Sequence, residues 1–161
     1  MTIDPSNLTT YTNEKHSYTV KRPVGWESNK AASTTVTFTS AGGFMIVQAV
    51  DVPGMSKSVS LKPFIQGYFK GYNERFKEFE ILEKKKIQLP NNHTGIVVNL
   101  RASQSSVRYR GKAVFAYANG TIYVVFLLVP RRVYGPTVKK GMRKILRSLT
   151  ITSSSTSTQS G

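Results

Sequence analysis

The feature that most constrains the fold is a pair of apolar runs near the end of the chain, RYRGKAVFAYA and TIYVVFLLV, separated by Asn119-Gly120. Asn-Gly between two such runs is the strongest short-range signal for a hairpin with a type I′ turn. Two further runs, EILEKKKIQL and GIVVNLRAS, precede it and also have strand character. The sequence therefore predicts an antiparallel meander of four strands over residues 80–129.

More strands are expected upstream of this meander. Residues 16–20 form a short run that stops at Pro23, and Trp26 follows a turn. Val36 and Phe38 alternate with threonines, and FMIVQAVDV follows the Gly42-Gly43 turn, which predicts a second hairpin.

Two helices are predicted. Residues 61–76 place seven apolar or aromatic side chains on one face, which indicates a helix packed on the sheet. Gly67 and Gly71 within it each cost about 1 kcal/mol relative to Ala, which suggests that another backbone approaches there. The closing helix starts at Pro136, and its buried stripe comprises Val138, Met142, Ile145 and Leu149.

The length of 161 residues suits one domain. We expect a flexible N-terminal segment at residues 1–14, a single folded domain at 15–151, and a flexible Ser/Thr-rich tail at 152–161. The absence of cysteine excludes disulfides and zinc thiolates. No apolar run approaches the roughly 18 to 20 residues of a membrane span, so no span is expected.

This order of elements resembles the PsbP-like superfamily, the extrinsic photosystem II protein and its many non-photosynthetic relatives. The likeness lies in Tyr18-Thr19-Val20 with Pro23 and Trp26, in the hairpin GKAVFAYANGTIYVV, and in the final KKGMRKILRSLTI. It implies an α+β fold in which an antiparallel sheet of about six strands is sandwiched between helices. It also implies a binding, scaffolding or assembly role, since few relatives are enzymes. The longer N-terminal region of the photosynthetic branch is not found, so a photosystem role does not transfer.

Charge is distributed unevenly along the chain. The formal net charge is +15, and residues 84–161 hold fourteen Lys or Arg and no Asp or Glu. A field of this sign attracts anions within a Debye length of about 8 to 10 Å, without identifying which anion.

The candidate binding residues are the cations of this second half. Arg108, Arg110 and Lys112 alternate along one strand, so we expect them to share a charged sheet face, with the core on the other face. On the closing helix the cations fall on the arc opposite the buried stripe. The complete candidate surface comprises Lys84, Lys85, Lys86, Arg108, Arg110, Lys112, Arg131, Arg132, Lys139, Lys140, Arg143, Lys144 and Arg147.

The sequence does not favour an enzyme. Neither His16 nor His93 stands at a metal-ligand spacing, and ion pairing at a helix end explains Glu74 and Glu78. We therefore predict no catalytic residue, no metal and no cofactor. A hydrolase or transferase stays open only if a pocket gathers one of the histidines with a glutamate.

The sequence thus predicts a non-enzymatic binding or assembly domain that docks an acidic protein or an anionic surface polymer. The alternative is a non-specific nucleic-acid or polyphosphate binder, held by phosphate attraction without sequence readout. A solubilising basic surface without a partner is a third interpretation of the same charge. Sequons at Asn7, Asn92 and Asn119 incline the interpretation towards an extracytoplasmic location, with the cytoplasm left open.

Overall fold

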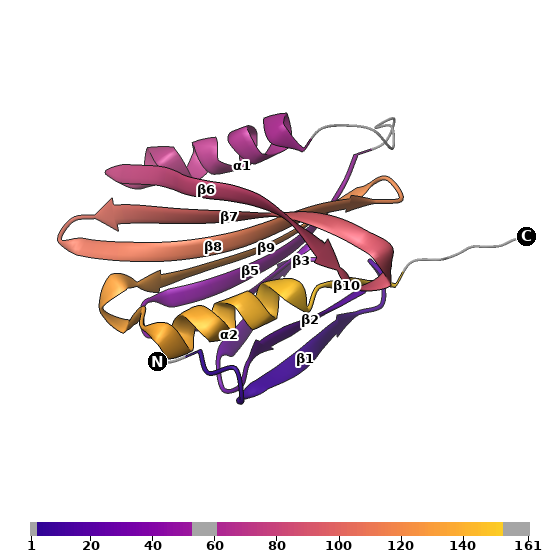
Figure 1. The fold of residues 1–161 in the computed structure, drawn as a ribbon, viewed down its shortest axis with the longest axis horizontal. Helices are drawn as coiled ribbons and strands as arrows, with labels where there is room; N and C mark the ends of the chain where they lie inside the picture. The colour runs from indigo at the N-terminus through magenta and orange to yellow at the C-terminus, as the bar shows by residue number, and fades with distance from the viewer. Residues whose placement is uncertain (1–2, 53–60, 153–161) are drawn as a thin grey trace, which may run out of the picture.

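The hairpin predicted around Asn119-Gly120 is formed by β8 (Val107–Ala118) and β9 (Thr121–Pro130). Both turn residues have positive φ, 53° and 80°, as a type I′ turn requires. The computed structural model describes residues 3–52 and 61–152, and within these ranges the hairpin lies at the centre of a seven-stranded antiparallel sheet (Figure 1).

The strand order of this sheet is β3-β4-β5-β9-β8-β7-β6, with every neighbouring pair antiparallel. A second sheet of three strands has the order β1-β2-β10. The remaining strands are β1 (Leu8–Asn13), β2 (Tyr18–Pro23), β3 (Glu27–Ala32), β4 (Thr35–Ser40), β5 (Gly43–Asp51), β6 (Glu78–Leu89), β7 (His93–Gln104) and β10 (Thr150–Ile151).

Two α-helices cover opposite faces of the large sheet. α1 (Lys62–Arg75) packs Ile65 and Phe69 on one face, against Phe115 and Phe126. α2 (Pro136–Arg147) buries its stripe on the other face, in a core shared with the three-stranded sheet. The predicted stripe, Val138, Met142, Ile145 and Leu149, is buried throughout. Two short 3-10 turns, at Pro90–Asn92 and Arg131–Val133, are the remaining elements of the described residues.

The sheets contain more strands than the sequence predicted. Seven strands plus three replace the single sheet of about six that the resemblance implied, and the expectation from the sequence runs omitted β1 and β3. The interpretation of residues 1–14 as flexible is wrong from Ile3 onward. Leu8–Asn13 pairs with β2 along its full length, and Ile3 is completely buried. The expected flexible tail lies outside the described residues, apart from Thr152.

The outer strands of the seven-stranded sheet are both irregular. The register of β6 shifts between Ile81 and Glu83, and that of β3 shifts between Lys30 and Ala32. In β6 the extra residue changes which side chains face α2. Before the shift, Phe79 and Ile81 pack on the α1 side, whereas Ile87 beyond it packs on the α2 side.

The expected close approach at Gly67 and Gly71 is wrong. A Cβ at either position would meet no atom within 4 Å, so these glycines face open space on α1. A close approach occurs instead at Gly141 of α2, where the backbone of Ile3 lies against the helix. Neither α-helix in the described ranges has the length and apolar character of a membrane span.

Candidate functional site

A groove of about 460 Å³ lies between α2 and the face of the large sheet formed by β6, β7 and β8. Six cationic side chains line it, and Glu83 supplies the one carboxylate among the lining residues. The two elements that form its walls supply the cations, namely Lys85, Arg110 and Lys112 from the sheet and Lys139, Arg143 and Arg147 from α2.

Strand alternation brings the sheet cations together. Lys112 lies opposite Asn99 of β7, and Glu83 of β6 is the next residue across the same ladder. Since cross-strand partners share a face, this row points towards α2. Further along β8 the same face continues as buried Val114 and Ala116, so it is charged over only the first half of the strand. The expectation of one charged face and one core face on this strand is therefore wrong beyond Lys112, where both faces are core.

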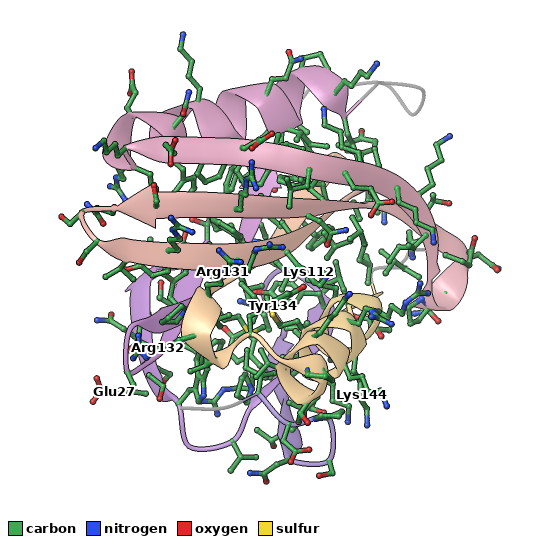
Figure 2. All side chains as sticks on the ribbon, turned by 60° about the vertical axis from the view of Figure 1, so that its left-hand side comes forward. Glu27, Lys112, Arg131, Arg132, Tyr134 and Lys144 are labelled. Atoms are coloured by element: carbon green, nitrogen blue, oxygen red, sulfur yellow. The ribbon has the colours of Figure 1, made fainter. Side chains whose placement is uncertain are left out.

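Lys112 is the floor of the groove and the buried charged residue of the described chain, with 5% of its surface exposed. Figure 2 shows it in the space between the sheet and α2, beside Tyr134. Its ammonium donates one hydrogen bond, to Oδ1 of Asn99. Among the described residues no carboxylate lies within ion-pair distance of it.

The environment of Lys112 disfavours its positive charge. Burial is the largest cause, and with the neighbouring charges of Lys139 and Arg143 it lowers the pKa of Lys112 to about 8. Arg110 acts in the same direction, whereas Glu83 opposes it. The carboxylate of Glu83 is linked to Lys112 indirectly, because its Oε1 accepts a hydrogen bond of 2.9 Å from Nδ2 of Asn99. Asn99 thus connects the ammonium to the carboxylate through its amide.

The groove also has an apolar part. Ile87, Val97 and Leu146 line it, together with Leu82, which the irregularity in β6 leaves 43% exposed. At the cationic part, the guanidinium of Arg110 lies 5.8 Å from the ring centroid of Tyr134. One groove is therefore lined by cations, an aromatic ring and aliphatic side chains.

A second hollow of about 310 Å³ adjoins the groove and shares Arg110 with it. Arg108 and Arg131 line it, but Glu78 and Glu80 do so as well, and Arg101 forms a 2.6 Å ion pair with Glu80. Arg132 lines a shallower depression with Arg108 and Arg131. The positive excess in this region is smaller than in the groove.

Besides Arg108, Arg131 and Arg132, four more of the predicted cations do not line the groove. Lys84 and Lys86 pair with Val98 and Ile96, which pack on the α1 side, so these two lysines lie on the opposite face from Lys85. Lys144 lies on the side of α2 away from Lys112 (Figure 2) and donates a 2.9 Å hydrogen bond to the carbonyl of Pro5. Lys140 is exposed on α2 outside the groove lining.

The sequence interpretation did not include Asn99, Glu83 or Tyr134 in the site. Asn99 carried a signal, since it is a polar residue within the otherwise apolar run GIVVNL. Tyr134 carried none, because it follows a 3-10 turn where no periodicity applies.

The histidines lie away from the groove. The backbone carbonyl of His16 accepts a hydrogen bond from the hydroxyl of Tyr123, and Nδ1 of His93 lies 3.4 Å from the carbonyl of Pro90. Neither lines the two hollows that hold the cations. Across residues 3–52 and 61–152, no group of three or more His, Cys, Asp or Glu side chains is placed to hold a metal ion.

Comparison with solved structures identifies the fold. The chain is similar to cyanobacterial PsbP (CyanoP) from Synechocystis sp. PCC 6803, with a TM-score of 0.72, 16% identity, and coverage of 90% of this chain and 92% of the other. It is also similar to PA94, a protein of unknown function from Pseudomonas aeruginosa, with a TM-score of 0.55, 10% identity and coverage of 89% and 96%.

No family model and no curated protein sequence matches this chain. At these identities the similarity shows the fold alone, and the chain has the PsbP-like α+β fold that its sequence predicted.

Proposed function

We propose that this protein is a non-enzymatic binding domain that docks an acidic protein or an anionic surface polymer through the groove beside α2. The observation that carries the proposal is the groove's composition, in which five cations and one carboxylate surround the buried ammonium of Lys112, which has no ion-pair partner among the described residues. Cations that serve only solubility stay in water, whereas Lys112 is removed from it.

The position of the cations favours binding over a diffuse surface charge. Attraction between charges is stronger in a partly desolvated groove than on an open surface, where solvent screens it. The groove also gathers cations from β6, β8 and α2, which are separate in sequence. An acidic segment lying along it would contact all three elements at once.

Nucleic acid is the alternative occupant. Proteins that bind single strands without sequence preference combine cations with aromatic side chains on which bases stack. Tyr134 is the aromatic residue among those that line this groove. Many other aromatic rings, among them Tyr68, Phe69, Phe115 and Phe126, pack against one another between α1 and the sheet. The groove therefore suits an acidic polypeptide or polymer better than a nucleic-acid strand whose bases must stack on aromatic side chains.

Two triple variants with the same change of net charge test the proposal. Lys139, Arg143 and Arg147 are changed to Glu in the groove variant, and Lys84, Lys86 and Lys140 in the control. Each is titrated with an acidic protein bait, duplex DNA and single-stranded RNA over a range of salt concentrations. We expect the groove variant to lose at least about tenfold in affinity for the acidic bait while the control keeps it.

The outcomes separate the candidate functions. Equal losses in both variants indicate that only net charge matters, which overturns the proposed groove. Binding to nucleic acid alone, with a steep logarithmic dependence on salt, rejects the acidic partner in favour of the alternative. Binding to none of the three by the unmodified protein leaves a solubilising surface and rejects both.

A further inference from the structure

We propose that the cationic part of the groove, around Lys112, is a specific site for a phosphate monoester, whose organic body lies on the apolar part. This inference rests on the groove assigned under the proposed function, and it names the chemical group that the groove selects. The source of that group is either a small phosphate ester or a phosphorylated side chain of a partner.

Unused hydrogen-bond donors converge at this end of the groove. An ammonium carries three N–H donors, and Lys112 uses one of them on Asn99 among the described residues. The guanidinium groups of Arg110 and Arg143 line the same space and can donate paired bonds to one oxyanion. A phosphate monoester offers three strongly accepting terminal oxygens, against two in a carboxylate.

The charge balance also favours a dianion. Lys112, Arg110, Lys139 and Arg143 repel one another across the groove, and each of the other three lowers the pKa of Lys112. Glu83 is the one carboxylate among the lining residues, and its Oε1 is bonded to Asn99. A group carrying close to two negative charges at neutral pH offsets this repulsion more fully than a single carboxylate does.

The shape of the groove indicates that the phosphate carries an organic body. Its volume of about 460 Å³ lies within the range of sites for small organic ligands. Leu82, Ile87, Val97 and Leu146 form an apolar surface next to the cations, and Tyr134 is close to Arg110. An aromatic or aliphatic phosphate ester would cover both parts, whereas inorganic phosphate would occupy one.

Binding should be linked to protonation of Lys112. The charged or titratable groups that line the groove with its ammonium are Glu83 and Lys85 of β6, Arg110 of β8, Tyr134, and Lys139, Arg143 and Arg147 of α2. A bound dianion adds negative charge to this set and favours the ammonium. We expect complex formation at about pH 8 to take up protons, which calorimetry in buffers of different ionisation enthalpy measures.

The experiment is titration calorimetry at constant ionic strength with phenyl phosphate, inorganic phosphate and benzoate. The proteins are the unmodified chain, Lys112→Met, Arg143→Gln and the control Lys84→Gln with Lys86→Gln. We expect phenyl phosphate to bind more tightly than inorganic phosphate, and benzoate to bind most weakly. Lys112→Met and Arg143→Gln should each lose about tenfold or more, and the control should be unchanged.

A tyrosine-phosphorylated peptide and its unphosphorylated form, compared with phenyl phosphate, distinguish the two sources. Tighter binding of the phosphorylated peptide indicates a partner's side chain, and tighter binding of phenyl phosphate indicates a small ester. Both results support the inference. Arg143 is exposed, so its variant keeps the test decisive if Lys112→Met were to fold poorly.

Two outcomes overturn the inference. One is equal affinity for benzoate and phenyl phosphate, and the other is binding of phenyl phosphate that both Lys112→Met and Arg143→Gln leave unchanged. The acidic bait keeps this test separate from that of the proposed function. If the bait binds through the groove and the phosphates do not, the inference fails and the proposed function stands. If phenyl phosphate binds and the bait does not, the docking of an acidic partner fails while the phosphate site stands.

Discussion

Gly141 of α2 lies directly against the backbone of Ile3, so that a Cβ at Gly141 would come 2.5 Å from the carbonyl oxygen of Ile3. The N-terminal segment therefore passes over the helix where the helix has no side chain. The segment is fastened there by two further features, the buried Ile3 side chain and the hydrogen bond from Lys144 to the carbonyl of Pro5.

The first prediction concerns this contact. Gly141→Ala should lower the free energy of unfolding by about 1 kcal/mol or more, since overpacking against backbone costs more than the added helix propensity gains. Chemical denaturation measures the change. In a chain lacking residues 1–5, the same substitution should become neutral or stabilising, because the obstructing carbonyl is gone. A loss of equal size in both backgrounds would show that Ile3 is not the cause.

The second prediction concerns the glycines of α1. Gly67→Ala and Gly71→Ala should each raise the free energy of unfolding by about 0.5–1 kcal/mol, because both positions face open space within a helix. Thermal or chemical denaturation checks this. A lower free energy of unfolding in either variant would contradict the open space assigned to these two positions on α1.

The third prediction concerns pH. The pKa of Lys112 is about 8 in the folded protein and near the ordinary lysine value of 10.5 when unfolded. Below pH 8 both states carry the charge, and its burial destabilises the fold. Between pH 8 and about 10.5 the unfolded state holds the extra proton, so stability rises with pH.

Replacement by Met removes this dependence. Lys112→Met should be more stable than the unmodified chain at pH 7, and its advantage should shrink as the pH rises to 10. Urea denaturation of both proteins at each pH isolates the effect, because the other lysines and tyrosines titrate in both. A difference that stays constant from pH 7 to 10 would contradict the assigned environment of Lys112.

The fourth prediction concerns Asn99. Asn99→Asp places a carboxylate where the amide oxygen now accepts from Lys112, so the pKa of Lys112 should rise towards its ordinary value. The dependence of stability on pH above 8 should then weaken relative to the unmodified chain. Affinity for phenyl phosphate should fall, since the ammonium is already paired, and calorimetry measures it. Unchanged affinity would show that the ammonium of Lys112 does not contribute to the binding of phenyl phosphate.

The strands and helices that could be predicted were those whose own residues carry a period. The central hairpin follows from Asn119-Gly120 and two apolar runs, and the stripe of α2 follows from Val138 and Met142. β1 and β3 could not be predicted in this way. Their sequences, LTTYTN and ESNKAA, are mostly polar, and backbone pairing with a neighbouring strand places them.

The site could be predicted in composition more than in arrangement. Lys84, Lys85 and Lys86 are adjacent in sequence, but a strand sends alternate residues to opposite faces, so Lys85 alone of the three reaches the groove. The approach of α2 to β8, which buries Lys112, is a tertiary contact that no local pattern encodes.

The register shifts in β3 and β6 have a consequence beyond the orientation of their own side chains. In the part of the chain that the structure describes, these are the outermost strands of the seven-stranded sheet, and the backbone amide and carbonyl groups along such a strand can template the addition of a strand from another molecule. An inserted residue breaks the even spacing that such addition requires. The irregular backbone of each outermost strand therefore disfavours fibrous self-association. This effect persists at salt concentrations that screen the charges of the lysines.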